Sequence, residues 1–320
     1  MMSGPRNKGG VGMGTPPSPA GPAVRPSQPA SGRGHGDDRI LPLSRIVAAV
    51  VIVILILATW VLYFHPTSTA TSFAWTIKPR MTPLLMGAGY GSAIYFYVRV
   101  LTERRWHRVA LGFLPTTAFT WLLISATILS WGKFHHGSLN FALWLWIYIV
   151  TPVLVPGVWL LNRRADPGDL ETRDALIPDP VRRVLIAIGA GLVAMVVLIY
   201  VWPAGAIKVW PWTVTPLTAR TIAGFTILPG VSWLVVAVDR RWSAFRITVE
   251  TVIVGLVLLL VAVARAWGDF DRSNPLTWVY VGGVAATLAG AAALYVGMER
   301  LARTRTAGPA LRPVGTAEST

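Results

Sequence analysis

The stretch Ile46–Phe64, IVAAVVIVILILATWVLYF, carries no charge over a length that can cross a bilayer as one helix. Seven further stretches have the same character. The eight predicted spans are Ile46–Phe64, Thr82–Leu101, Val109–Ser130, Leu139–Leu161, Val184–Trp202, Ala219–Val238, Ile247–Ala266 and Leu276–Met298. Because a helix satisfies its own backbone hydrogen bonds in lipid, we predict an all-α fold: a polytopic transmembrane helix bundle.

Composition supports this assignment and excludes several kinds of chemistry. Of 320 residues, 53% are hydrophobic and only 13% are charged, against about 25% charged in a soluble domain. There is no Cys, which excludes disulfides, thiolate catalysis and Cys-ligated metal centres. No Walker A, HExxH or G-x-S-x-G sequence occurs. We therefore expect no cofactor and favour a non-enzymatic protein.

The placement of the basic residues predicts the topology. Most of the 29 Lys and Arg residues lie in the N-terminal tail, in alternate loops and in the C-terminal tail, all on one side of the predicted spans. Positively charged loops stay in the cytoplasm, so both termini are expected there, in a bacterial inner membrane. The clusters are short and juxtamembrane. We expect them to meet anionic inner-leaflet lipids and no nucleic acid.

The second half of the chain repeats blocks of the first half in the same order. Phe73-Ala74-Trp75-Thr76 recurs as Trp210-Pro211-Trp212-Thr213, Arg104-Arg105-Trp106 as Arg240-Arg241-Trp242, and Trp131-Gly132-Lys133-Phe134 as Trp267-Gly268-Asp269-Phe270. Four spans return the chain to its starting side, so the two four-helix repeats are expected to be parallel.

These patterns divide the chain into five segments. We predict a disordered Gly/Pro-rich tail at 1–40, a first repeat at 41–164, a cytoplasmic linker at 165–181, a second repeat at 182–301 and a flexible tail at 302–320. The linker holds most of the remaining acid/base candidates besides His107, namely Asp166, Asp169, Glu171, Asp174 and Asp179. Its three prolines indicate a tether.

Small and aromatic residues suggest how the spans pack. Gly87-xxx-Gly91 and Gly282-xxx-Ala286-xxx-Gly290 place small residues on one helix face, which predicts close helix contacts. The six tryptophans at span boundaries are expected to form interfacial belts. They are Trp75, Trp131, Trp212 and Trp267 on the outer side and Trp106 and Trp242 on the inner side.

The outer loops hold the first candidate functional residues. His135 and His136 lie in one copy, and Asp269 and Asp271 lie in the corresponding loop of the other. If the repeat brings the loops together, these side chains could bind a divalent metal, form a pH-responsive contact or form an ion pair between the repeats. The alternative is that they are solvated and have no function.

Charges inside the spans are the second group of candidates. Glu250 lies four residues after Arg246, so the two share a helix face; we predict an ion pair, with Asp239 as another possible partner. Arg265 is expected to pair with Asp269, and Arg220 begins the sixth span. Hydroxyls in the third span either line a passage or bond to their own helix.

The segment Trp212–Arg220, WTVTPLTAR, and the stretch Ala126–His135 resemble a family of uncharacterised actinobacterial integral-membrane proteins with paired four-helix units. The resemblance covers roughly residues 40–300. It implies a membrane fold and no particular activity, cofactor or catalytic residue.

Three functions follow as hypotheses. The first is a non-enzymatic membrane protein in envelope organisation or a membrane complex, with a membrane protein partner or as a homo-oligomer. The alternative is a transporter or permease for a small solute, with its site between the repeats. A membrane-embedded enzyme that uses the outer His and Asp residues is the third.

Overall fold

The computed structural model describes residue 9 and residues 37–171 and 174–306, and those from 37 onward form one compact unit. In this part of the chain every regular element is a helix, apart from two isolated bridges. Eight helices are long and apolar enough to cross a bilayer. The all-helical prediction is confirmed, and the chain is a multi-pass membrane protein. Most of the two predicted tails lies outside the described residues.

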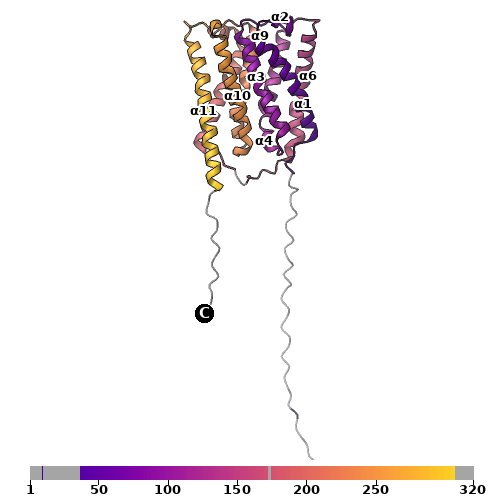
Figure 1. Ribbon diagram of the computed structural model, residues 1–320, viewed down its shortest axis with the longest axis vertical. Coiled ribbons are helices and arrows are strands. Elements are labelled where there is room, and N and C mark those ends of the chain that lie inside the picture. Colours follow the sequence, from indigo (N-terminus) through magenta and orange to yellow (C-terminus); the bar gives the residue numbers. More distant parts are fainter. Residues whose placement is uncertain (1–8, 10–36, 172–173, 307–320) are drawn as a thin grey trace, which may run out of the picture. The chain divides into compact units, whose positions relative to one another are not determined.

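Each long helix overlaps one predicted span over most of its length, and Figure 1 shows these helices side by side. They are α1 (Pro42–Thr59) with the π-helix Trp60–Phe64, α3 (Met81–Thr102), α5 (Phe113–Leu129), α6 (Leu139–Asn162), α7 (Asp179–Val201), α9 (Pro216–Leu234), α10 (Trp242–Arg265) and α11 (Pro275–Thr306). The short helices between them are α2 (Thr69–Ser72), α4 (His107–Ala110) and α8 (Pro203–Val209).

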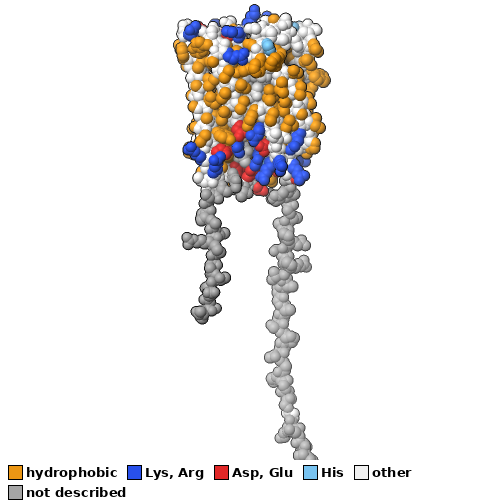
Figure 2. Space-filling model, in the orientation of Figure 1, with side chains coloured by type: hydrophobic (Ala, Val, Ile, Leu, Met, Phe, Trp, Pro, Cys, Tyr) orange, Lys and Arg blue, Asp and Glu red, His pale blue; other side chains and the backbone are white. Residues whose placement is uncertain are grey.

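The helix ends meet at two faces. The linker face contains 37–41, 103–106, 166–171, 174–178 and 238–241, and the hairpin face contains 65–80, 130–138, 202–215 and 266–274. Hydrophobic side chains form a belt between the faces, and charged side chains gather at both ends of it (Figure 2). This separation is the one expected of helices that cross a bilayer.

The helices pair in the same way in both halves. α1 packs on α3 as α7 packs on α9, and α5 packs on α6 as α10 packs on α11. Between the halves, α3 packs on α10 and α5 packs on α9. Where α3 and α5 meet α9, the ring of Phe225 lies 5.1 Å from Tyr90 and 4.9 Å from Phe119. Aromatic rings therefore close this part of the interface between the halves.

The close helix contacts predicted from the two small-residue motifs are present for one motif and absent for the other. A Cβ at Gly87 would lie 2.7 Å from the Cβ of Tyr63, and one at Gly91 would lie 2.8 Å from Leu258. The close contact predicted for this motif is confirmed. The prediction for the eighth helix is wrong, because Gly282 and the rest of its stripe are exposed and a Cβ at Gly282 would meet nothing within 4 Å. α11 packs mainly on α10 alone, and this stripe faces outward.

Gly87→Ala is expected to lower the free energy of unfolding by about 1–3 kcal/mol. The added methyl group would lie 2.8 Å from the backbone nitrogen of Tyr63, and backbone cannot move aside cheaply. Gly282→Ala is the matched control and is expected to leave stability unchanged or raise it by up to about 1 kcal/mol. Thermal unfolding of the full chain in detergent measures both. Equal behaviour of the two variants would contradict the close approach of α1 to α3.

The outer tryptophan belt is only partly present. Trp131 is exposed, as expected for an interfacial ring, but Trp75 and Trp212 are buried. Trp75 packs edge-on at 4.9 Å from Trp144 of α6, and Trp212 packs edge-on at 5.2 Å from Tyr280 of α11. The prediction is wrong for these two because the loops fold back over the helix ends and direct the rings inward.

Candidate functional site

The linker is packed against the bundle, so its interpretation as a tether is wrong. The backbone N–H of Trp242 donates to the carbonyl of Ala175 at 2.9 Å. The segment before α1 makes the same contact in the first half, where Trp106 N–H donates to the carbonyl of Asp38 at 2.8 Å. Both indoles are buried, which makes the prediction of inner anchors wrong for them. The structured chain thus includes Asp38, inside the predicted tail.

Arg241 is the central cation of the linker face. Its side chain is only 8% exposed and bonds to Asp166 at 3.0 Å through Nη1 and to Asp239 at 2.6 Å through Nη2. Burial lowers the pKa of Arg241, but its bonds to the two carboxylates raise it by more, so the pKa lies above its usual range. Arg241 therefore stays charged and joins the linker to the turn before α10.

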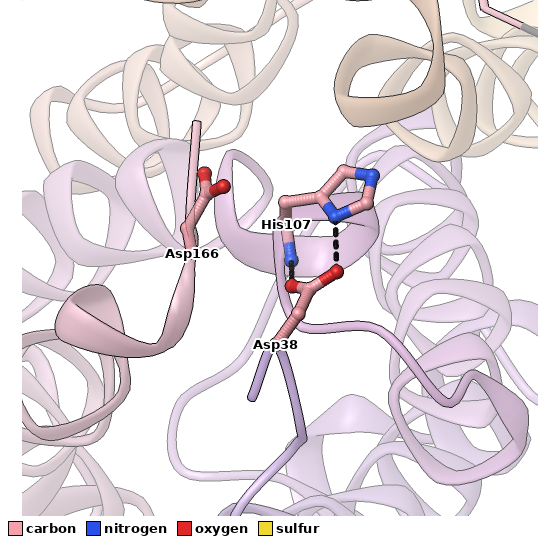
Figure 3. Close-up of side chains that lie close together, drawn as sticks. All are labelled: Asp38, His107 and Asp166. Atoms are coloured by element: carbon pink, nitrogen blue, oxygen red, sulfur yellow. Dashed lines mark hydrogen bonds and ion pairs between the residues drawn. The ribbon is translucent and has the colours of Figure 1, made fainter. Parts of the chain in front are cut away.

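His107, the first residue of α4, has a side chain only 3% exposed and lies against two acidic groups, of which Figure 3 shows Asp38. Its Nδ1–H donates to Asp38 at 2.6 Å, and its backbone N–H donates to the same carboxylate at 3.1 Å. Its Nε2 lies 3.0 Å from Oε1 of Glu171, an ion-pair distance without hydrogen-bond alignment. This histidine connects the segment before α1 with the linker.

A metal ion is the functional alternative for this cluster. Ligand atoms of Asp38, His107 and Asp166 lie within 4.8 Å of one another, the only such group in the described chain. Imidazole and carboxylates are ordinary metal ligands. Here, however, Asp166 is already bonded to Arg241 and Asp38 to His107. A metal would have to displace these bonds. The arrangement therefore fits a group of structural ion pairs better, formed by Asp38, His107, Asp166, Asp239 and Arg241, which we call the clamp.

Glu171 extends the clamp to α4. Arg108 donates to both of its oxygens, at 2.7 Å from Nε and 2.6 Å from Nη2, and Arg105 lies 3.2 Å away. Burial raises the pKa of Glu171, but its interactions with His107 and Arg108 lower it by more, so it lies well below the usual range. Glu171 thus remains ionised and fixes the linker to the first half of the chain.

Glu250 is a second centre of charge. The predicted bond from Arg246 is confirmed at 3.1 Å. Glu250 also accepts from Arg99 at 2.8 Å, Tyr95 at 2.6 Å and Tyr295 at 3.1 Å. Asp239 is not the partner of Arg246, since Asp239 bonds to Arg241. Arg99 and Tyr95 come from α3, and Arg99 could have been suspected as a charge in an apolar span that needs a partner.

A polar cavity of about 450 Å³ lies among these side chains. Its charged lining is balanced, with Arg99, Arg108, Arg246 and Arg303 facing Glu103, Glu171, Asp174 and Glu299. Balanced charges give little net attraction for an ion. The network therefore acts mainly to hold α3, α4, α10, α11 and the linker together.

The outer histidines bond within their own half. His135 Nε2 lies 3.2 Å from Oγ1 of Thr76. His136 Nε2–H donates to the carbonyl of Trp131 at 2.9 Å. Neither contacts Asp269 or Asp271 in the described chain. The hypothetical metal site or ion pair between the two loops is not formed in this structure.

The two aspartates have separate roles at the hairpin face. Asp271 accepts from the hydroxyl of Ser273 at 2.6 Å, inside its own turn. Asp269 accepts from the backbone N–H of Met81 at 2.8 Å and lies 3.9 Å from Arg80. A carboxylate at a helix N-terminus is stabilised by the helix dipole. Asp269 therefore does connect the halves, through the start of α3 and not through the histidines.

The two remaining candidate arginines, Arg220 and Arg265, donate to backbone carbonyls. Arg220 donates to the carbonyl of Tyr200 at 3.3 Å. Arg265 donates to the carbonyl of Tyr63 at 2.7 Å and stacks 5.0 Å above its ring. The predicted pairing of Arg265 with Asp269 is wrong, because the end of the first span offers a closer acceptor.

The hydroxyls of the third span bond to their own helix. Thr116, Thr117, Thr120, Ser125 and Thr127 each donate to a carbonyl three or four residues earlier. This is the local bonding that such side chains make in transmembrane helices. They offer few free polar groups to a solute.

A second, larger cavity is apolar and lies between α7 and α9 on one side and α10 and α11 on the other. Its volume is about 810 Å³, and α3 and α5 also contribute to its wall. It extends from Thr248, in the first turns of α10, to Lys208 at the hairpin face. Ligand pockets typically measure about 300–1,000 Å³. The space is therefore large enough for a small molecule or a lipid chain.

The two halves differ at one pair of residues beside this cavity. In the first half Tyr148 of α6 reaches Tyr90 of α3, with hydroxyls 2.7 Å apart, and the rings fill the space. Val284 holds the same position relative to the start of α11 as Tyr148 relative to the start of α6. Val284 lines the cavity, because its short side chain cannot fill it.

No protein-family model, curated protein or solved structure matches the chain. What the protein does must therefore follow from its cavity and its charges.

Sequence reasoning missed both the cavity and the clamp. A signal for the cavity existed in the small residues of α11, which stand where α6 carries bulky rings. The clamp gave a weaker signal, because its members are far apart in the chain and looked like solvated loop residues.

Proposed function

We propose that the protein holds the apolar chain of a lipid in the cavity bounded by α7, α9, α10 and α11. The observation that carries this is the cavity itself, about 810 Å³ with an almost wholly apolar lining. A dry apolar space of this kind excludes water but accepts apolar molecules. In a bilayer the apolar molecules at hand are lipids.

The proposal also covers the membrane in which the protein lies, its orientation and its role there. The protein is a non-enzymatic component of the bacterial inner membrane, with both termini in the cytoplasm and its basic linker face toward anionic lipids. The concentration of arginine at that face supports this orientation. Lipid holding would serve envelope organisation or a membrane complex with a partner protein or a second copy of the chain.

Two parallel repeats are also part of the proposal. The matching helix pairs and the equivalent contacts of Asp38 with Trp106 and Ala175 with Trp242 support it. We also propose that the chain belongs to the actinobacterial membrane family with paired four-helix units that its sequence resembles, which agrees with such an architecture.

The permease alternative places a polar solute between the repeats. Tyr90, Phe119 and Phe225 pack against one another at that interface. The large cavity is apolar, which favours a lipid over a polar solute.

Photocrosslinking tests the proposal. The probe is phosphatidylcholine with a diazirine in its acyl chain, added to the full chain in detergent and mapped by peptide mass spectrometry. We expect labels on the cavity-lining positions of α9, α10 and α11. Gly283→Trp, which fills the cavity from its wall, should reduce this labelling several-fold. Gly282→Trp, at the neighbouring residue that does not line the cavity, should not.

Labelling spread evenly over all lipid-facing helices, and unchanged by Gly283→Trp, would overturn the proposed function.

A further inference from the structure

Lys208 is the only charged side chain among the residues that line the apolar cavity. It lies in the last turn of α8 at the hairpin face and is exposed. In the described part of the chain it forms no ion pair or hydrogen bond. The cavity thus ends at a membrane boundary beside a cation that no protein group neutralises.

The other cations of the hairpin face differ from Lys208 in one of two respects. Arg220 and Arg265 donate to backbone carbonyls. The others are exposed like Lys208 but do not line the cavity, namely Lys78, Arg80, Lys133 and Arg272. Only Lys208 combines a free ammonium group with direct access to the apolar space.

Two further donors lie at the same end of the cavity. Trp210 and Tyr280 both line it, and the indole Nε1–H and the phenol hydroxyl are buried without any hydrogen-bond partner. A buried polar group without a partner is costly. Both atoms are covered in this conformation, so a ligand oxygen reaches them only if the side chains turn toward the cavity.

We infer, building on the proposed function, that the lipid held in the cavity is anionic, with a phosphate headgroup at Lys208 and its chain along α9, α10 and α11. The ammonium group supplies three donors and no acceptor, which matches the acceptor oxygens of a phosphate. Trp202 and Trp210 border the same site and place amphipathic rings at headgroup level, as interfacial aromatics do. An anionic membrane lipid satisfies both the apolar wall and the cation at its end.

Two probes with identical diazirine chains test this inference on the full chain in detergent. They are phosphatidic acid and diacylglycerol, which differ in the phosphate. We expect phosphatidic acid to label the cavity several-fold more than diacylglycerol at low salt. Lys208→Gln should remove this preference while diacylglycerol labelling persists. Lys208→Arg should preserve it, and the matched control Lys133→Gln should leave it unchanged.

An unchanged preference in Lys208→Gln, or equal labelling by both probes in the parent chain, overturns the headgroup inference and leaves the proposed function standing. If neither probe labels the cavity, the proposed function itself is overturned. The two failures are therefore distinguishable.

Discussion

Arg241→Met is expected to lower the free energy of unfolding by about 3–5 kcal/mol, the usual cost of removing one partner from a buried ion pair. The guanidinium of Arg241 is almost fully buried and joins Asp166 of the linker to Asp239. Without it the two partly buried carboxylates lie close together with no cation between them. Thermal unfolding in detergent, followed by tryptophan fluorescence, measures the loss.

The neighbouring residue provides the control. The side chain of Arg240 is 39% exposed and pairs with Asp179, which is more exposed still. Exposed pairs contribute about 0–1 kcal/mol, so Arg240→Met should have a small effect. Limited proteolysis should also cut the linker faster in Arg241→Met than in Arg240→Met. Equal losses of stability in the two variants would contradict the clamp.

Glu250→Leu should have the second large effect, a loss of about 3 kcal/mol or more. The carboxylate accepts bonds from Arg99 on α3, Arg246 on its own helix and Tyr295 on α11. Leucine removes all of these bonds and leaves partly buried guanidinium groups at the membrane boundary. The midpoint of thermal unfolding again measures the change.

Glu250→Gln keeps two polar atoms without the charge and should fall between the parent chain and Glu250→Leu. Asp271→Asn is the control, because that fully exposed carboxylate bonds only inside its own turn. Its effect should stay within about 0.5 kcal/mol. If Glu250→Leu were as stable as the control, Glu250 would not connect the three helices.

The spans were predictable because length and apolarity alone decide them. Local pairs were predictable as well. Arg246 and Glu250 lie four residues apart on one helix, so the spacing itself brings them together. Both inferences depend on neighbours in the sequence.

Contacts across the fold were not predictable in the same way. Arg241 bonds to Asp166, and His107 to Asp38, over long sequence separations. Tryptophan suits both a membrane boundary and a protein core, so the sequence left the burial of Trp75 undecided until the path of its loop was known. The cavity depends on the difference in size between Tyr148 and Val284, which the sequence shows. It also depends on which side chains each of them faces, and the sequence does not show this.

Native mass spectrometry of the full chain released from detergent micelles tests the central claim most directly. If the cavity holds a lipid, the spectrum should show the protein with one retained lipid mass, and Gly283→Trp should lose that mass while Gly282→Trp keeps it. A spectrum of the bare protein alone, or a retained mass that Gly283→Trp leaves unchanged, would contradict the account.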